Sequence, residues 1–427
     1  RSMTIPNSST GPPAASQLQV PARLLGTPQL VSKGEADLIL AALHGPLPAG
    51  MFFPFLETEK PKGIEVKNGV AIIPVMGGLT YRGYDIYDLA DNASFEEVAY
   101  LLLHGKLPTQ AELDDYIAKI KTLRGLPDAL KTVLEMIPAD AHPMDVLRTG
   151  VSFLGNIEPE GDFSNQTKVA DRLLAALPSM MIYWHRFHTD GVRIETATDD
   201  DSIAGHFLHM LHDKPPPALH EKCLSTTLIL YAEHEFNAST FTGRVITATL
   251  SDMHSAISGA IGALRGPLHG GANEAAMELI QKFSTPEEAT AGVKGMLERK
   301  ELIMGFGHRV YTTSDPRNAV NKKMSRQLAE EAGDLTLYDV SEAIEKVMWD
   351  EKKLFANADF FAASVYHFMG VPTYLFTPIF GAIERITGAR GYRGKFGIED
   401  PGGIDTRFLF RIQLEGAELG PEVRNRE

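Results

Sequence analysis

Apolar residues along this chain recur mostly at helical spacing. Leu113, Ile117 and Ile120 follow one another at intervals of four and three residues, which places their side chains on one face of a helix. Two apolar stretches, 169–184 and 224–232, are longer than ordinary strands and indicate buried helices. The pattern predicts a mostly α fold with more than about a dozen helices and two or three short strands.

Residues with clear capping chemistry mark the ends of several of these helices. Segments 94–97 (SFEE) and 109–112 (TQAE) are capping boxes, in which the first hydroxyl and the last carboxylate each cap a backbone amide. Gly105 is the matching stop after the first of them. Proline in the first helical turn predicts three further starts, at Pro143, Pro286 and Pro316.

The strand signal is much weaker and is confined to the N-terminal part. Residues 69–75 form a short apolar run with β-branched side chains, which is typical of a strand. The first forty-odd residues are rich in Pro, Ser, Gly and Ala and predict a loose arm, and residues 270–370 are more charged than those before them. The expected organisation is an arm (1–45), a large helical domain (46–270), a small domain (271–370) and a return to the large domain with an atypical tail (371–427).

Composition narrows the classes of partner. The 427 residues carry 41 Lys and Arg against 55 Asp and Glu, so the net charge is 41 − 55 = −14. Such an acidic protein is not expected to bind nucleic acid or an anionic membrane. The single cysteine, Cys223, excludes an intrachain disulfide and a cysteine-rich metal site. Neither a transmembrane stretch nor a secretory h-region is predicted, and the expected compartment is the bacterial cytoplasm, or the mitochondrial matrix in a eukaryote.

Common cofactor motifs are missing from the sequence. There is no HExxH, GxGxxG or P-loop segment, so zinc hydrolase, dinucleotide and nucleotide-phosphate chemistry are not favoured. His206, His209 and His212 are spaced by three residues and could suggest a metal site, but no carboxylate or cysteine completes a known spacing. We favour packed or surface histidines there and expect no metal.

Two of the 14 histidines lie in glycine-flanked turns. His269 follows Gly266, precedes Gly270 and Gly271, and stands just before a predicted helix at 272–283. A neutral imidazole near a helix N-terminus can donate a hydrogen bond to a developing oxyanion. His308 lies in a second such turn. One such histidine alone would be interpreted as structural, but two of them indicate a site.

Asp359 is the third candidate, in the apolar helical run that begins at Asn357. Apolar surroundings raise the pKa of a carboxyl group, which suits a general base. An equally good interpretation is that Asp359 is the N-cap of that helix, and the two roles are compatible.

These residues also carry a resemblance. The segments GPLHGGANE (266–274), GFGHRVY (305–311) with DPR (315–317), and NADF (357–360) resemble the three catalytic segments of the citrate synthase family. Further segments are similar in order and spacing, at 81–86, 142–146, 199–206 and 234–240. The resemblance extends from about Leu79 to Gly388 and is greatest to the branch of the family that makes 2-methylcitrate from propionyl-CoA.

The resemblance implies a site that joins an acyl-CoA to oxaloacetate. Asp359 would remove a proton next to the thioester carbonyl, His269 would stabilise the enolate, and His308 would polarise the ketone of oxaloacetate. A base, an oxyanion donor and an electrophile are also the groups that such a carbon–carbon bond formation needs. Oxaloacetate would be bound by His234, Asn237 and Arg317, and CoA by Leu268, Gly305, Gly307 and Arg309.

The resemblance further implies a multi-helical fold with a large and a small domain, a homodimer, and no cofactor beyond the CoA thioester substrate. Both propionyl-CoA and acetyl-CoA are expected to react, with citrate synthase proper as the alternative. The tail departs from the family pattern, because residues 389–427 lack its tryptophan and its Arg-Pro pair. The tail is therefore either replaced, as by a frameshift, or supplies a substitute arginine from among Arg390, Arg393, Arg407 and Arg411. A catalytically impaired dimer with a binding role is the alternative of another class.

Overall fold

The first of two compact units of the chain contains short strands. The structure is a computed structural model that describes residues 65–67, 70–72, 78–234, 237–266 and 269–379, and the chain divides into units of residues 1–83 and 84–427. In the first unit, β1 (Glu65–Lys67) pairs antiparallel with β2 (Val70–Ile72), and β3 (Thr80–Tyr81) follows. Strand β2 confirms the strand predicted within 69–75. The predicted arm at 1–45 lies outside the described residues.

The described residues of the second unit lie almost wholly in helices and the loops that join them. After strand β4 (Tyr84–Asp85) its elements are α2 (Ile86–Asn92), α3 (Phe95–His104), α4 (Gln110–Thr122), α5 (Asp128–Met136), α6 (Pro143–Ile157), η5 (Phe163–Asn165), α7 (Gln166–Asp190), α8 (Ile203–His212), α9 (Ala218–Leu230), α10 (Ala238–Ala248), α11 (Met253–Leu264), α12 (Ala272–Ile280), α13 (Pro286–Glu298), α14 (Pro316–Ala332), α15 (Thr336–Lys352), α16 (Ala358–Phe368) and η6 (Thr373–Leu375). The predicted mostly α fold is confirmed.

The predicted helix ends coincide with these boundaries. Ser94 and Glu97 form a complete capping box on α3, and Gly105 ends that helix in the left-handed region with φ of 87°. Thr109 and Glu112 cap α4 in the same way. Prolines 143, 286 and 316 occupy the first helical turns of α6, α13 and α14. Local sequence therefore determines where these helices begin.

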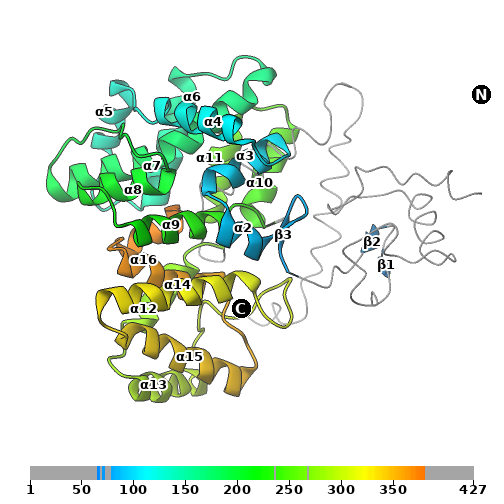
Figure 1. The fold of residues 1–427 in the computed structure, drawn as a ribbon, viewed down its shortest axis with the longest axis vertical. Coiled ribbons are helices and arrows are strands. Elements are labelled where there is room, and N and C mark those ends of the chain that lie inside the picture. The colour runs from blue at the N-terminus through cyan, green and yellow to red at the C-terminus, as the bar shows by residue number, and fades with distance from the viewer. Residues whose placement is uncertain (1–64, 68–69, 73–77, 235–236, 267–268, 380–427) are drawn as a thin grey trace, which may run out of the picture. The chain divides into compact units, whose positions relative to one another are not determined.

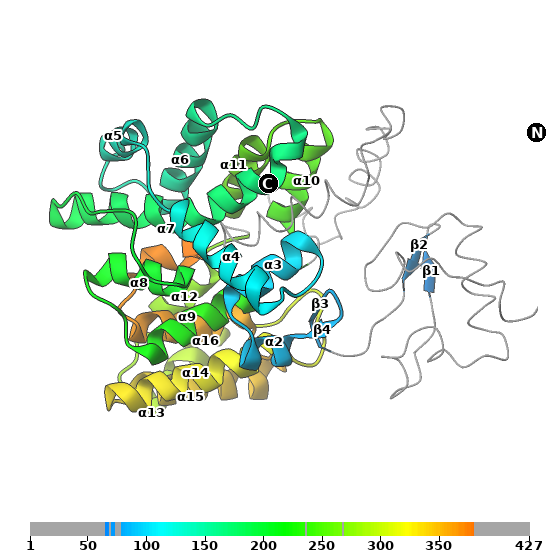
Figure 2. The ribbon, with the colours of Figure 1, turned by 45° about the horizontal axis from the view of Figure 1, so that its top comes forward.

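Helix α7 is the centre of one group of helices. Its side chains are buried without interruption from Leu173 to Arg186, and it packs against α5, α6 and α8. Helices α10 and α11 pack against each other, and α11 also packs on α6, as Figures 1 and 2 show. A helix that is apolar all round is stable only inside such a group, which explains the long apolar stretch in the sequence.

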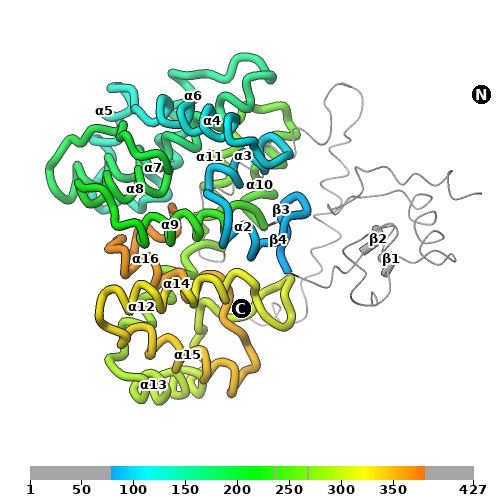
Figure 3. The backbone as a smooth tube through the Cα atoms, viewed as in Figure 1, coloured from blue at the N-terminus to red at the C-terminus, as the bar shows by residue number. Residues whose placement is uncertain are grey.

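Helices α12 to α16 form the other group. Helix α16 packs against α12 and α14 and also contacts α9, and α13 packs against α15. Phe360, Phe361 and Tyr366 of α16 are fully buried. The tube in Figure 3 shows α12–α15 gathered at one end of this unit, with α16 between them and the α9 region. The border between a large and a small domain stays a prediction.

Candidate active site

Helix α16 presents Asp359 in its first turn. The N-cap is Asn357, whose side-chain Oδ1 accepts a hydrogen bond of 3.0 Å from the backbone N–H of Asp359. The interpretation of Asp359 as the N-cap is therefore wrong. An amide two residues earlier already caps the helix, so the carboxylate of Asp359 is available for other contacts.

Among the described residues, one side chain donates to the carboxylate of Asp359. The hydroxyl of Tyr231, which follows the end of α9, donates a hydrogen bond of 2.7 Å to Oδ1. Burial raises the pKa of Asp359, and the bond from Tyr231 and the charge of Arg317 oppose this rise without cancelling it. Part of the Asp359 surface stays accessible. A carboxylate with a raised pKa and an open side is suited to accept a proton from a bound molecule.

Arg317 lies beside this carboxylate at the start of α14. Asp315, the N-cap of α14, binds the guanidinium at two points, Nε to Oδ1 at 3.0 Å and Nη2 to Oδ2 at 2.8 Å. Asp315 and Arg317 are 2% and 6% exposed, respectively, so the pair is buried. Burial alone would raise the pKa of Asp315, but the charge and hydrogen bonds of Arg317 hold it below its usual range.

The same aspartate also reaches α16. Oδ2 of Asp315 accepts a hydrogen bond of 3.0 Å from the backbone N–H of Ala358, the residue before Asp359. Asp315 thus joins the N-termini of two helices that are 43 residues apart in the chain. The Nε edge of Arg317 is occupied by this contact, and the edge formed by Nη1 and Nη2 is the one suited to a ligand carboxylate.

His308 lies next to Arg317 in the turn predicted from the sequence. Gly305 and Gly307 adopt φ of 88° and 72°, which favours glycine at both positions. The backbone amides of Val310 and Tyr311 point at Nδ1 of His308, at 3.1 and 3.3 Å. Nδ1 is therefore the acceptor and Nε2 carries the ring hydrogen.

The other ring nitrogen of His308 faces the guanidinium. Nε2 lies 3.5 Å from Nη2 of Arg317, and burial together with that charge lowers the pKa of His308. The neutral ring and the guanidinium thus present N–H donors side by side. Such a pair is suited to bind adjacent oxygen atoms of a polar ligand.

His234 completes this cluster. Its ring centroid lies 4.9 Å from that of His308, and a hydrogen bond of 3.1 Å joins Nε2 to the hydroxyl of Tyr311. Burial, assisted by the charge of Arg317, lowers the pKa of His234 to about 3. His234 is consequently neutral in any ordinary buffer and acts as a hydrogen-bonding group rather than a charge.

His269 belongs to a neighbouring cluster at the start of α10. Its Nε2 lies 3.2 Å from the backbone N and 2.6 Å from Oγ of Ser239. An N–H donor pointing at Nε2 places the ring hydrogen of His269 on Nδ1. Asn237 is the N-cap of α10, and its Oδ1 accepts hydrogen bonds from Thr240 N and Ser239 Oγ. Its role in the structure is thus to fix this turn.

The helix predicted after His269 is present but shorter than expected. Helix α12 runs from Ala272 to Ile280, three residues short of the predicted end. Gly270 is tightly enclosed, because an added Cβ would lie 2.1 Å from the carbonyl oxygen of Leu264. The backbone at Gly270 is thus packed directly against the backbone at Leu264.

The remaining candidates differ in how far the structure describes them. Residues 305–307 run beside residues 355–357 with a bridge between Phe306 and Ala356, and Arg309 is exposed. Leu268 lies outside the described residues, and so does the tail with Arg390, Arg393, Arg407 and Arg411.

Five residues at the site carried no expected role: Tyr231, Ser239, Tyr311, Asp315 and Asn357. Four of them, Ser239, Tyr311, Asp315 and Asn357, stand inside the segments quoted above, and Tyr231 is the one that does not.

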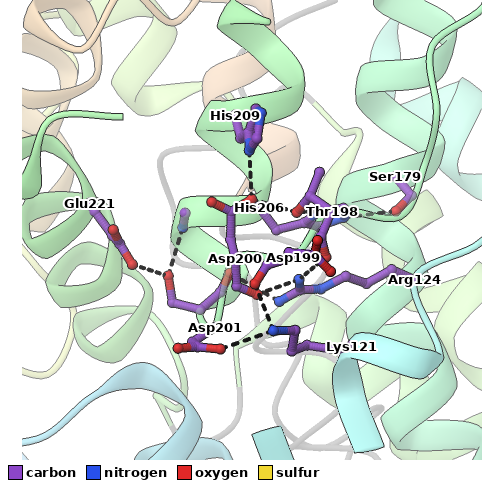
Figure 4. A network of polar contacts seen from close by, with 12 residues as sticks. Lys121, Arg124, Ser179, Thr198, Asp199, Asp200, Asp201, His206, His209 and Glu221 are labelled. Atoms are coloured by element: carbon purple, nitrogen blue, oxygen red, sulfur yellow. Dashed lines mark hydrogen bonds and ion pairs between the residues drawn. The ribbon is translucent and has the colours of Figure 1, made fainter. Parts of the chain in front are cut away.

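The three histidines of α8 have separate structural partners, which Figure 4 shows for two of them. His206 is fully buried, with Nε2 3.0 Å from Oγ of Ser179 and Nδ1 3.0 Å from Oγ1 of Thr198. His209 binds Asp200 at 2.8 Å. His212 binds the carbonyl of Met369, also at 2.8 Å. The interpretation of these residues as packed histidines is confirmed, and within the described residues no group of three or more His, Cys, Asp or Glu could hold a metal ion.

Arg124 organises the loop around His206. It is fully buried, and its guanidinium donates to the carbonyls of Thr198, Asp200 and Ser202. These three carbonyl acceptors, from alternate residues, fix the path of the chain into α8. This acidic segment, which is part of the family resemblance, is thus held as a structural loop.

Comparison with known proteins agrees with this arrangement. A family model described as "Citrate synthase, C-terminal domain" matches residues 66–390. The chain is 66% identical over 311 residues to a 2-methylcitrate synthase of Shewanella oneidensis, covering 73% of this chain and 83% of that protein. It is 43% identical to citrate synthase 2 of Bacillus subtilis, over 73% of this chain and 84% of the relative. Among solved structures, a ternary complex of carboxymethyl coenzyme A and oxaloacetate with the citrate synthase of Thermoplasma acidophilum matches with a TM-score of 0.70 at 28% identity, covering 79% of this chain and 92% of that one. Among the described helices, none is both long and apolar enough to cross a membrane.

Proposed function

The chain belongs to the citrate synthase family, and we propose that it condenses propionyl-CoA with oxaloacetate and water to give 2-methylcitrate and free CoA. The observation that carries this proposal is the 66% identity to a 2-methylcitrate synthase, against 43% to a citrate synthase. The protein is an enzyme that transfers an acyl group and converts it to an alkyl group. The geometry of the site supports a role for each group that this reaction needs.

Asp359 would act as the base. Its carboxylate takes a proton from the carbon next to the thioester carbonyl, and the electron pair left behind forms an enolate. Its raised pKa brings the proton affinity of this carboxylate closer to that of the weak carbon acid. His269 would hold the enolate oxygen with Nδ1–H, because Nε2 already accepts from the backbone N–H of Ser239.

His308 and Arg317 would bind and activate oxaloacetate. Nε2–H of His308 donates to the ketone oxygen, which makes the carbonyl carbon more electrophilic. The Nη1 and Nη2 edge of Arg317 binds one carboxylate of oxaloacetate. His234 forms a hydrogen bond, as donor or acceptor, at the edge of the same binding site. Asn237, the N-cap of α10, is proposed as a further binding residue for oxaloacetate. The enolate carbon attacks the ketone carbon, and the new alkoxide takes a proton.

The CoA thioester is the substrate, and water finally cleaves the resulting thioester bond to release CoA. Leu268, Gly305, Gly307 and Arg309 are proposed to bind the CoA moiety, with Arg309 facing its phosphates. Every step transfers a proton, forms a carbon–carbon bond or hydrolyses a thioester. The reaction therefore calls for no redox cofactor, and the side chains named supply its acid–base chemistry.

The acyl-chain preference rests on a small energy difference. One methylene in an apolar pocket is worth about 1–3 kcal/mol, so acetyl-CoA is proposed as a second substrate. A homodimer in the bacterial cytoplasm is proposed from the family alone.

Release of the CoA thiol tests the proposal directly. The purified chain is assayed with oxaloacetate and either propionyl-CoA or acetyl-CoA, and kcat/KM is measured for each. We expect release with both and a higher value for propionyl-CoA. A higher value for acetyl-CoA would make the protein a citrate synthase proper, and no release with either would favour a catalytically impaired paralogue.

A further inference from the structure

A short backbone pairing holds the turn of His308 against the start of α16. The amide of Gly307 donates to the carbonyl of Phe355 at 2.8 Å, and the amide of Asn357 donates to the carbonyl of Gly305 at 2.9 Å. Gly305 has little room for a side chain, since an added Cβ would lie 3.1 Å from Cβ of Phe360. The two segments are thus in close contact at the base of the site.

The side chain of Asn357 joins the same two segments a second time. Its Oδ1 accepts from the backbone N–H of Asp359 at 3.0 Å, and its Nδ2 donates to the carbonyl of Gly307 at 3.1 Å. Gly307 directly precedes His308 in the chain. One amide group therefore contacts the backbone of the candidate base on one side and the backbone next to the candidate electrophile on the other.

The orientation of His308 depends on this contact. The ring is held within its own turn, since Nδ1 accepts from Val310 and Tyr311. What fixes that turn relative to Asp359 is the pairing at residues 305–307 and the Asn357 side chain. Reactive groups must be held to a fraction of an ångström, because a displacement of about 1 Å can lower a rate about 100-fold.

We propose that Asn357 is a positioning residue that sets the distance between Asp359 and His308 for the condensation step. The inference rests on the proposed function, because it takes Asp359 as the base and His308 as the electrophile. Asparagine suits this task because it offers an acceptor and a donor on one planar group. Aspartate or serine would cap the helix equally well but would leave the Gly307 carbonyl without its donor.

Asn357→Ser is the decisive variant. Serine keeps an oxygen that caps α16, yet its short hydroxyl cannot also span to Gly307. We expect kcat for thiol release to fall about 10- to 100-fold, with KM for oxaloacetate within about threefold, because Arg317 and its partner Asp315 are untouched. Asn357→Ala, which loses both contacts, is expected to lose at least as much.

Thr285→Ala is the matched control. Thr285 is the N-cap of α13, where its side chain accepts from Glu288 N, and it is remote in sequence from the residues proposed to react. This variant loses a cap of the same kind, so it should lower the unfolding midpoint as Asn357→Ala does while kcat stays at the wild-type value. Circular dichroism melts and steady-state kinetics on the full-length variants give both numbers.

Two results would overturn the inference without touching the proposed function. The first is an active wild type whose Asn357→Ser variant keeps kcat within twofold. The second is a fall in kcat for Asn357→Ala that is matched by Thr285→Ala, which would show a general effect of lost capping. A wild type that releases no thiol with any acyl-CoA would overturn the proposed function and, with it, the inference.

Discussion

The hydroxyl of Tyr231 donates a hydrogen bond of 2.7 Å to Oδ1 of Asp359. The two residues are 128 positions apart in the chain, one just after α9 and the other in the first turn of α16. Burial favours the protonated carboxyl group, whereas this bond favours the carboxylate. The pKa of the proposed base is therefore a balance that one hydroxyl group can shift.

Removal of that hydroxyl should shift the pH dependence of the enzyme. In Tyr231→Phe the carboxylate loses a donor, so the pKa of Asp359 rises further. The base must be ionised to act, and the acid limb of kcat/KM should move to higher pH. A hydrogen bond to a charged group contributes about 1.5–3 kcal/mol, which corresponds to a shift of about one pH unit or more.

The measurement is the pH profile of thiol release between pH 5 and pH 9 for both proteins. At a pH well above the acid limb, Tyr231→Phe should recover most of the wild-type rate. An acid limb that stays in place would show that Tyr231 does not control the ionisation of the base. Tyr374→Phe, a change at an aromatic residue whose hydroxyl instead binds His185, should leave the profile unchanged.

Asp315 should contribute to stability through its charge. The carboxylate is buried and paired with Arg317, and its Oδ2 also accepts from Ala358 N. Asp315→Asn leaves the guanidinium without its counter-charge, a change that typically costs about 3–5 kcal/mol. Urea unfolding at pH 7 measures the loss, and KM for oxaloacetate should rise because Arg317 is no longer held.

The pH dependence of the same variant gives a second test. The pKa of Asp315 is lowered in the folded state, so its contribution to stability is complete above the unfolded value of about 4 and is lost as the pH falls below it. The difference in unfolding free energy between wild type and Asp315→Asn should therefore shrink between about pH 5 and pH 3. A difference that stays constant across this range would contradict the assignment.

The sequence predicts those parts of the fold that local chemistry determines. Ser94 and Glu97 cap α3 because a capping box needs only four adjacent residues, and Pro316 begins α14 because its ring fits the first turn. The glycines around His308 indicate a turn for the same local reason. The identity of the site followed from several such motifs in one order.

Contacts between distant segments could not be predicted in this way. Neither the bond from Tyr231 to Asp359 nor the reach of Asp315 to Ala358 leaves a pattern in the local sequence, because each depends on how α9, α14 and α16 pack. The interpretation of Asp359 as the N-cap of α16 is wrong for a related reason. Both Asn357 and Asp359 are good caps, and tertiary contacts of Asp359 decide between them.

His206 lies outside the candidate active site and should make the folded protein less stable in acid. It is buried and neutral, and burial lowers its pKa to about 3. Unfolded chains take up a proton on this residue near pH 6.5, so its effect is absent above that value. Stability should fall by up to about 1.4 kcal/mol for each pH unit from about 6.5 down to about 3.

A variant that cannot titrate isolates this effect. His206→Gln retains polar atoms that can face Ser179 and Thr198, although its unfolding free energy at pH 7 should be lower. As the pH is reduced from 7 to 5, the wild type should lose its advantage over the variant. Urea unfolding at three pH values measures the difference, and a constant difference would show that His206 is protonated in the folded protein.

Asp359→Asn should separate catalysis from folding. The amide has nearly the same shape, keeps an oxygen that can accept from Tyr231 and cannot remove a proton. Loss of a general base typically lowers a rate by about 10²- to 10⁴-fold, so thiol release with propionyl-CoA should fall by about a factor of 10³. The unfolding midpoint should not decrease, because the change removes a charge whose burial is unfavourable.

Oxaloacetate binding to the Asp359→Asn variant, followed by calorimetry, should stay within about threefold of wild type since Arg317 and His308 are unchanged. A variant that retains the wild-type turnover rate would exclude Asp359 as the base, whereas one that loses turnover together with its folded structure would call for Asp359→Glu, which should keep the charge and regain part of the rate.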